Sequence, residues 1–324
     1  MDKKLIFASV FLLTFHLIFT PIIGYDHARN LEVAREMANT GLMSYYGENF
    51  VSNPPLLYMV HALIIKLFGF HYILHRMVDL LFWIAAMFVL EALGKEVNVQ
   101  HLGLLIGLSW TFVYATAIRS YSDTLLLSAI MLLLYFRFKK EPSLRGAMWF
   151  GISYGVAGWA KYPPFLLSAF FLLDWLVHKK PLKYIIIALV VGSSFALPLI
   201  AYAQFNGLPM PWTASVDTNV VWRTGDPQTL YEPYLLLLKM WPALFTLAFS
   251  SLRLDLFSAI LVGVPLIGRV VSKVFEVRHY FFIIIAMGVL ASRFIEKKTM
   301  ALGCLLVCCM FSNFRPIRHL PLRF

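Results

Sequence analysis

Long apolar segments recur along almost the whole of this chain, and they constrain its fold more than any other feature. The composition is 60% hydrophobic and only 14% charged, with a mean hydropathy of +0.74. A water-soluble domain cannot hide this much apolar surface, because such domains are about 45–50% apolar and about 25% charged. We therefore expect one all-α polytopic membrane domain over residues 1–324.

About eleven transmembrane helices are predicted. The first segment, 5–23, follows two lysines and has no small-residue cleavage site, which favours a retained helix over a signal peptide. Several later segments are shorter than the roughly 20 residues that a straight helix needs to cross the hydrocarbon, so we expect water-filled space at one face. The later segments lie near 73–93, 101–118, 123–137, 146–160, 163–178, 184–204, 233–251, 254–270, 279–293 and 299–312.

Basic residues in the short loops indicate the orientation. Lys and Arg cluster in three loops, near 137–145, 179–183 and 293–298, which alternation places on one side together with the N-terminal lysines. The positive-inside rule makes that side cytoplasmic. The opposite side carries the long loops 25–72 and 205–232, yet it also holds about half of the basic residues. We expect a plasma (cell) membrane rather than the endoplasmic reticulum.

The net charge of +11 indicates which partners to expect. No basic tract with interleaved aromatic residues occurs in a soluble setting, so we expect no nucleic acid. Membrane lipid head groups and phosphate-bearing substrates fit better. The cysteines, all in the last apolar segment, show neither metal spacing nor a disulfide framework.

The first outer loop is predicted to contain two helices that lie in the membrane interface. Asp26 is a suitable N-cap for a helix that runs through Asn39 and ends at Gly41. Leu31, Ala34, Met37 and Ala38 share one face of that helix.

The second interfacial helix is apolar along its length. Asn53 can cap it, with Pro54 and Pro55 in its first turn and Gly69 as its stop. Such a helix can lie in the membrane interface.

Several polar residues on the outer side are candidates for chemistry, and each also has a structural interpretation. Asp26 is a carboxylate at the mouth of the bilayer, but it can be a cap only. Asp123 can be functional or can cap the fourth span, with Arg119 as its counter-ion. Lys161 can contact a phosphate or snorkel to the interface.

The same two interpretations apply to the later segments. Arg278 and His279 can bind substrate or anchor the late span at the interface. Trp222 and Arg223 can stack on a sugar ring or belong to an aromatic belt. Two pairs spaced at helical intervals are predicted to be structural: Arg76 with Asp79, and Asp174 with His178.

The order of these motifs resembles the GT-C superfamily of membrane glycosyltransferases, over about residues 25–310. The resemblance is closest to the branch that holds protein O-mannosyltransferases and lipid A aminoarabinose transferases. The motifs that carry it are the Tyr25-Asp26 loop, the Pro54-Pro55-Leu56 helix ending in Lys66-Leu67-Phe68-Gly69, Arg119-Ser120-Tyr121-Ser122-Asp123, Gly158-Trp159-Ala160-Lys161-Tyr162-Pro163-Pro164 and Arg278-His279-Tyr280-Phe281.

The resemblance implies an inverting transfer of a hexose or pentose from a polyprenyl- or dolichyl-phosphate donor, such as dolichyl phosphate mannose, on the extracytoplasmic side. Asp26 would be the catalytic carboxylate and Asp123 the second acidic residue. An attacking hydroxyl must lose a proton, which a carboxylate can accept, and the leaving phosphate needs positive charge around it. We expect that charge from Arg119, Lys161, Arg223 and Arg278, with Asn53, Trp222 and His279 as further substrate contacts.

The chain departs from the family pattern at two positions. Many relatives have Asp-Glu where this chain has Asp26-His27, and many have His or Lys where it has Asn53. No cofactor is predicted firmly. A divalent metal is possible, and its candidate ligands are Asp26, Glu48, Asp123 and His279.

Two other functions stay open from the sequence. A secondary transporter or lipid flippase would explain the outer charges, but it predicts an inverted repeat, and none is visible. A catalytically inactive GT-C-like scaffold subunit would explain the missing Glu after Asp26. The acceptor can be a lipid, a glycan or a protein.

Overall fold

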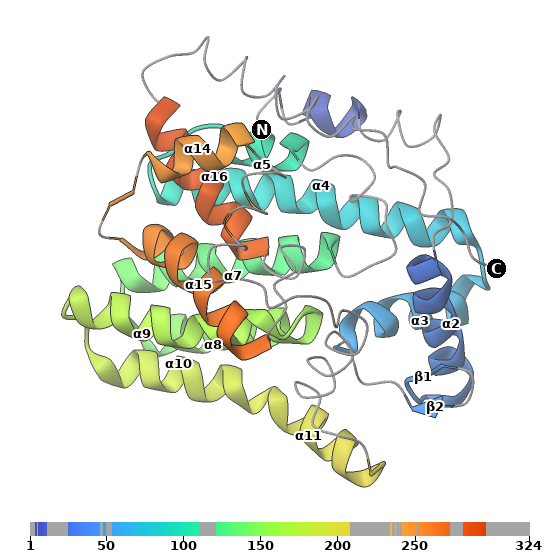
Figure 1. Cartoon of the computed structure of the whole chain (residues 1–324). Coiled ribbons are helices and arrows are strands. Elements are labelled where there is room, and N and C mark those ends of the chain that lie inside the picture. Colours follow the sequence, from blue (N-terminus) through green and yellow to red (C-terminus); the bar gives the residue numbers. More distant parts are fainter. Residues whose placement is uncertain are drawn as a thin grey trace.

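The computed structural model describes residues 4, 6–11, 25–45, 48–49, 54–109, 121–207, 234, 237, 242–250, 252–253, 255–272 and 281–295. Within these residues the chain is helical apart from one short hairpin, in which β1 (Ser44–Tyr45) pairs antiparallel with β2 (Glu48–Asn49) (Figure 1). The all-α class is therefore confirmed. The predicted segments 5–23 and 299–312 lie wholly or mostly outside the described residues.

Helices fill the described segments between 72 and 295 where the sequence predicted spans. Their bounds are α4 (Tyr72–Glu96), α5 (Leu102–Ser109), α7 (Ser122–Lys140), α8 (Leu144–Ala160), η1 (Pro163–Leu166), α9 (Leu167–Val177), α10 (Leu182–Ser194), α11 (Ala196–Phe205), α14 (Pro242–Phe249), α15 (Leu256–Ser272) and α16 (Phe281–Ile295). Of the described helices, Tyr72–Glu96 and Leu182–Phe205 are long and apolar enough to cross a membrane.

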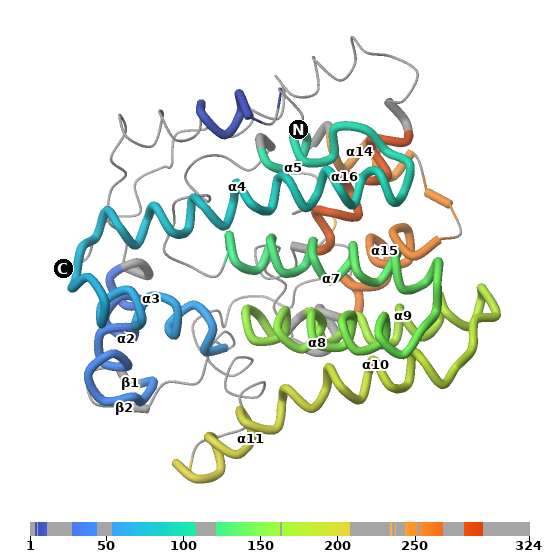
Figure 2. Tube along the Cα trace, turned by 180° about the vertical axis from the view of Figure 1, so that it is seen from behind, coloured from blue at the N-terminus to red at the C-terminus, as the bar shows by residue number. Residues whose placement is uncertain are grey.

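Four helices lie side by side in the order α4, α7, α8, α10, as both views show (Figures 1 and 2). An aromatic cluster ties this layer to α9. The ring of Tyr135 on α7 lies 5.2 Å from that of Phe150 on α8 and 4.5 Å from that of Phe171 on α9. All three side chains are fully buried, so these helices form one continuous core.

Glycines bring α8 and α10 into backbone contact. A Cβ on Gly151 would lie 2.6 Å from the carbonyl oxygen of Ala188, and one on Gly155 would lie 2.8 Å from that of Gly192. Small residues spaced four apart allow this close approach between helices in membranes. The packing of α10 against α8 therefore depends on the absence of side chains at these positions.

Residues 25–72 contain the two predicted helices, α2 (Tyr25–Thr40) and α3 (Leu56–Phe68), which pack against each other. Both predicted stops are confirmed, because Gly41 and Gly69 each have φ +78°, a conformation that favours glycine. The predicted buried face of α2 is also confirmed: Leu31, Ala34 and Ala38 are buried, and Met37 packs against a small core.

The predicted starts of both helices are wrong. Helix α2 begins at Tyr25, so Asp26 already lies inside its first turn. Helix α3 is capped by Pro55, whose carbonyl accepts the N–H of Met59 at 2.9 Å. A proline serves in this place because a residue that leads into a helix needs its carbonyl but not its N–H. The prolines therefore precede the helix and do not form its first turn, and Asn53 lies outside the described residues.

Candidate active site

One end of the helical layer brings together buried polar groups from α3, α4, α7 and α8. Figure 1 shows α2 and α3 beside the start of α4. Asp123 occupies the first turn of α7, and Lys161 follows the last turn of α8, where its N–H bonds to the carbonyl of Ala157 at 3.1 Å. Both side chains are buried, with 3% of Asp123 and 9% of Lys161 exposed. The sequence predicted both residues as candidates, and the structure places them at the same end.

Only one of the two oxygens of the Asp123 carboxylate accepts a hydrogen bond from a described residue. Its Oδ1 accepts the backbone N–H of Thr124 at 2.8 Å, whereas Oδ2 is buried and has no hydrogen-bond partner among the described residues. Asp79, Lys161 and His61 all lie close enough to interact with it electrostatically. A buried carboxylate with an open oxygen can accept a proton or a hydrogen bond from a bound hydroxyl.

Sequence reasoning missed a second polar group at this end, formed by His61, His75 and Asp79. The three side chains are 1%, 0% and 0% exposed. Nδ1 of His61 lies 2.9 Å from Nδ1 of His75, and Nε2 of His61 lies 3.6 Å from Oδ1 of Asp79. Two signals in the sequence point to this group: His75 and Asp79 are one turn apart on α4, and His61 shares the face of Tyr58 on α3.

The predicted structural pair of Arg76 with Asp79 belongs to a wider polar group. Asp79 also has an ion-pair contact with His61 on α3, and the guanidinium of Arg76 lies 5.5 Å from the centre of the Tyr72 ring. Arg76 still acts on Asp79 electrostatically. Asp79 therefore also links α4 to α3.

Two tyrosines border this end of the bundle. The hydroxyl of Tyr58 on α3 donates to Oδ1 of Asn30 on α2 at 3.3 Å, which fixes these two helices to each other. Tyr162 lies in the turn between α8 and η1. Burial, with a smaller effect of Tyr58, raises the pKa of Tyr162, so its hydroxyl stays a neutral hydrogen-bond donor.

The remaining predicted site residues are not placed by the described part of the structure. For Asp26 and Glu48 only the backbone is described, in α2 and β2. The others lie outside the described residues: Asn53, Arg119, Trp222, Arg223, Arg278 and His279. The described residues hold no group of three or more His, Cys, Asp or Glu that could bind a metal ion. Three of the four candidate ligands have no described side chain, so the divalent metal stays a prediction.

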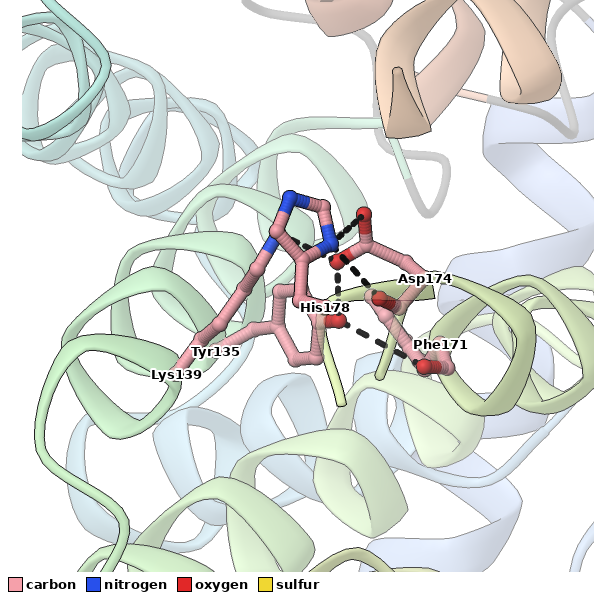
Figure 3. A network of polar contacts seen from close by, with 5 residues as sticks. All are labelled: Tyr135, Lys139, Phe171, Asp174 and His178. Carbon is pink, nitrogen blue, oxygen red and sulfur yellow. Dashed lines mark hydrogen bonds and ion pairs between the residues drawn. The ribbon is translucent and has the colours of Figure 1, made fainter. Parts of the chain in front are cut away.

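The opposite end of the bundle is held by ion pairs (Figure 3). Nζ of Lys139 lies 2.7 Å from Oδ2 of Asp174, which also accepts the Tyr135 hydroxyl at 2.5 Å. His178 is 3.4 Å from the same carboxyl group. The predicted pairing of Asp174 with His178 is thus part of a larger network that joins α7 to α9, which fits its expected structural role.

Further ion pairs and one cavity lie at this second end. Glu96 accepts from Arg137 at 3.0 Å and from Lys140 at 2.6 Å, and Arg293 pairs with Asp255. A cavity of about 80 Å³ lies between α9 and α15, lined mainly by apolar side chains. Because these charges satisfy one another, we assign this end a structural role.

Comparison with known proteins identifies the fold. No protein-family model and no curated sequence matches the chain. Two crystal structures of ArnT from Cupriavidus metallidurans do match. The one bound to undecaprenyl phosphate has a TM-score of 0.68 at 17% identity and covers 94% of this chain and 62% of its own. The apo structure has a TM-score of 0.58 at 17% identity and covers 92% of this chain and 61% of its own.

The chain therefore shares the fold of these ArnT structures, which agrees with the family resemblance stated from the sequence. The chain spans about three fifths of the length of the two ArnT structures.

Proposed function

We propose that this protein is an inverting membrane glycosyltransferase that takes a hexose or pentose from a polyprenyl- or dolichyl-phosphate donor. The supporting observation is a buried acid, Asp123, and a buried base, Lys161, at adjoining helix ends of this fold. Donor and acceptor would meet there at the extracytoplasmic face. The match to a protein bound to undecaprenyl phosphate supports the lipid-phosphate donor. The acceptor would be a lipid, a glycan or a protein.

The proposed reaction requires a negatively charged carboxylate at Asp123 and a positive charge at Lys161. The acceptor hydroxyl oxygen bonds to the anomeric carbon as the bond from that carbon to the phosphate oxygen breaks. The electron pair leaves with the phosphate, and the hydroxyl proton passes to a carboxylate, Asp123 or Asp26. The departing anion needs positive charge near it, which Lys161 supplies. Arginine would add bidentate contacts to the phosphate oxygens.

The untested site residues complete this proposal. We assign phosphate contact to Arg119, Arg223 and Arg278, and substrate contact to Asn53, Trp222 and His279. If a divalent metal binds, Asp26, Glu48, Asp123 and His279 are its candidate ligands.

The membrane arrangement is part of the same proposal. Residues 1–324 would form one domain with about eleven spans in the plasma membrane. Helix α3 exposes Met59, Leu63, Leu67 and Phe68, which suits an apolar face buried in the membrane interface. The end of the bundle with Lys139, Lys140 and Arg145 would face the cytoplasm.

Transfer from a panel of labelled polyprenyl-phosphate sugars tests the function. We expect the purified protein to consume one donor, and the Asp26→Asn and Asp123→Asn variants to do so about 10²–10⁴ times more slowly. Glu141→Gln, exposed at the other end of α7, is the matched control and should keep full activity.

The alternatives predict different results in the same preparation. A transporter or flippase would move a labelled lipid across vesicles without cleaving it. A scaffold subunit would do neither. Either result, with no donor consumed, would overturn the proposed transferase.

A further inference from the structure

The cavity between α9 and α15 has walls that suit an apolar guest. Its volume of about 80 Å³ is several times the roughly 10–15 Å³ that one water molecule needs. Most of the wall consists of apolar side chains from the two helices: Phe170, Leu173 and Val177 on α9, with Leu256 and Ala259 on α15. Apolar cavities of this kind stay dry and accept apolar molecules, so these walls favour hydrocarbon over water or a polar metabolite.

The cavity is closed at its inner end and open along one side. A Cβ on Gly263 of α15 would lie 2.8 Å from the ring of Phe170, so the two helices touch there. Phe170 precedes the end of α9 at Val177 by about two turns, or about 10 Å of helix. On the open side, Leu173 and Val177 are 56% and 60% exposed. In a membrane protein an exposed apolar rim meets acyl chains, which can enter the cavity from the side.

The polar groups that line the cavity are already satisfied by other residues. The Asp174 carboxylate pairs with Lys139 at 2.7 Å, and the Asp255 carboxylate pairs with Arg293. Nδ1 of His178 lies 2.7 Å from the backbone carbonyl of Asp174 and therefore donates to it, because a carbonyl can only accept. The lining itself thus leaves no carboxylate without a counter-charge.

Two further cations stand at the polar end of the cavity, one on each helix. The backbone N–H of Lys179 donates to the carbonyl of Leu176 at 2.9 Å, which holds Lys179 at the end of α9. The backbone N–H of Arg253 donates to Oγ of Ser258 at 2.9 Å, which holds Arg253 at the start of α15. Both cations are exposed, and neither has an ion pair among the described residues. The polar end of the cavity therefore carries an excess of positive charge.

We propose that this cavity binds an anionic phospholipid of the surrounding membrane, with part of one acyl chain between α9 and α15 and the phosphate beside Lys179 and Arg253. Basic pockets between transmembrane helices recognise anionic head groups in this way. The site lies at the opposite end of the bundle from Asp123 and Lys161, so it does not depend on the proposed transferase function. The lipid would occupy space that the side chains of the two helices leave open, and would thereby stabilise their contact.

Photo-crosslinking locates the lipid. The full-length protein in detergent is incubated with a phosphatidylglycerol that carries a diazirine in its acyl chain, and the labelled residues are identified by mass spectrometry. We expect labelling at Leu173, Val177 and Ala259. Unlabelled phosphatidylglycerol should compete about 25-fold better than phosphatidylcholine, because each basic residue strengthens the binding of anionic lipid about fivefold. Equal labelling of Val190, an exposed position on α10, would show an ordinary lipid layer and overturn the proposal.

Variants separate the apolar and the charged contributions. Ala259→Phe fills the cavity and should abolish the labelling, whereas Val190→Phe, at a position that is 63% exposed, is the matched control and should retain it. Lys179→Gln combined with Arg253→Gln should remove the preference for phosphatidylglycerol over phosphatidylcholine. Arg145→Gln, which removes an exposed cation from α8 at the same end, should keep that preference. An unchanged preference in the double variant would overturn the assignment of the phosphate.

Thermal unfolding in detergent supplies a second readout. Phosphatidylglycerol should raise the unfolding temperature of the wild type more than the same amount of phosphatidylcholine, and should lose this advantage in Ala259→Phe. If Ala259→Phe fails to fold, Val177→Phe, on the exposed rim, decides in its place. Inorganic phosphate alone should have no effect. Equal stabilisation by inorganic phosphate, or an unchanged lipid effect in the folded variants, would overturn the lipid site.

Discussion

Nζ of Lys139 on α7 lies 2.7 Å from Oδ2 of Asp174 on α9, and both side chains are largely withdrawn from solvent, 15% and 6% exposed. The Tyr135 hydroxyl donates to the same oxygen. The Asp174 carboxylate thus binds two side chains of α7, those of Lys139 and Tyr135. The contact between α7 and α9 therefore depends on one negative charge.

Removal of that charge should destabilise the fold. Asp174→Asn leaves the Lys139 ammonium without its counter-ion, and breaking a buried pair on one side costs about 3–5 kcal/mol. We expect a clear drop in the thermal unfolding temperature in detergent. Glu96→Gln is the control, because its partners Arg137 and Lys140 are 56% and 61% exposed and such pairs contribute about 1 kcal/mol or less. An equal drop in unfolding temperature for Asp174→Asn and Glu96→Gln would contradict the structural role of Asp174.

The glycine contact between α8 and α10 gives a second prediction. Gly151→Ala places a methyl group 2.6 Å from the carbonyl oxygen of Ala188, so the helices must separate. Overpacking of this kind costs about 1–3 kcal/mol, measurable as a lower unfolding temperature. Met148→Ala, on an exposed position of the same helix, should have little effect. Gly151→Ala with unchanged stability would show that α10 can shift freely.

The positive charge of Lys161 should contribute more to transfer activity than the shape of its side chain. Lys161→Met is expected to lower kcat/KM for the lipid-phosphate donor about 10²–10³-fold, because a positive charge beside the leaving phosphate is lost. Lys161→Arg should retain most of the activity. The two variants are compared by initial rates over a range of donor concentrations. A Met variant as active as the Arg variant would remove Lys161 from the site.

Cysteines placed at the two ends of the bundle should react with a labelling reagent from opposite sides of the membrane. Lys66 on α3 and Arg145 on α8 are both exposed. With Cys304, Cys308 and Cys309 replaced by serine, we expect Lys66→Cys in intact cells to react with an impermeant thiol reagent. Arg145→Cys should react only after the cells are broken. Reaction of both positions in intact cells would refute the proposed orientation.

Much of the helical framework could be predicted from sequence, because most of the described helices coincide with local apolar runs. Gly41 and Gly69 end their helices as expected, and Asp123 and Lys161 lie at the ends of theirs. The His61–His75–Asp79 group could not be predicted in this way. Its members lie on two helices whose crossing depends on tertiary packing, which residue periodicity does not encode.

The corner at Gly69 has a mechanical consequence. Only Gly69, Phe70 and His71 separate the end of α3 at Phe68 from the start of α4 at Tyr72. So short a connection restricts how far α3 and α4 can move relative to each other. The rings of His61 on α3 and His75 on α4 are in contact. A bilayer whose thickness or head groups tilt α3 against α4 therefore changes the gap between the two rings. Lipid composition thus becomes a variable that acts on the buried histidines without contact with them.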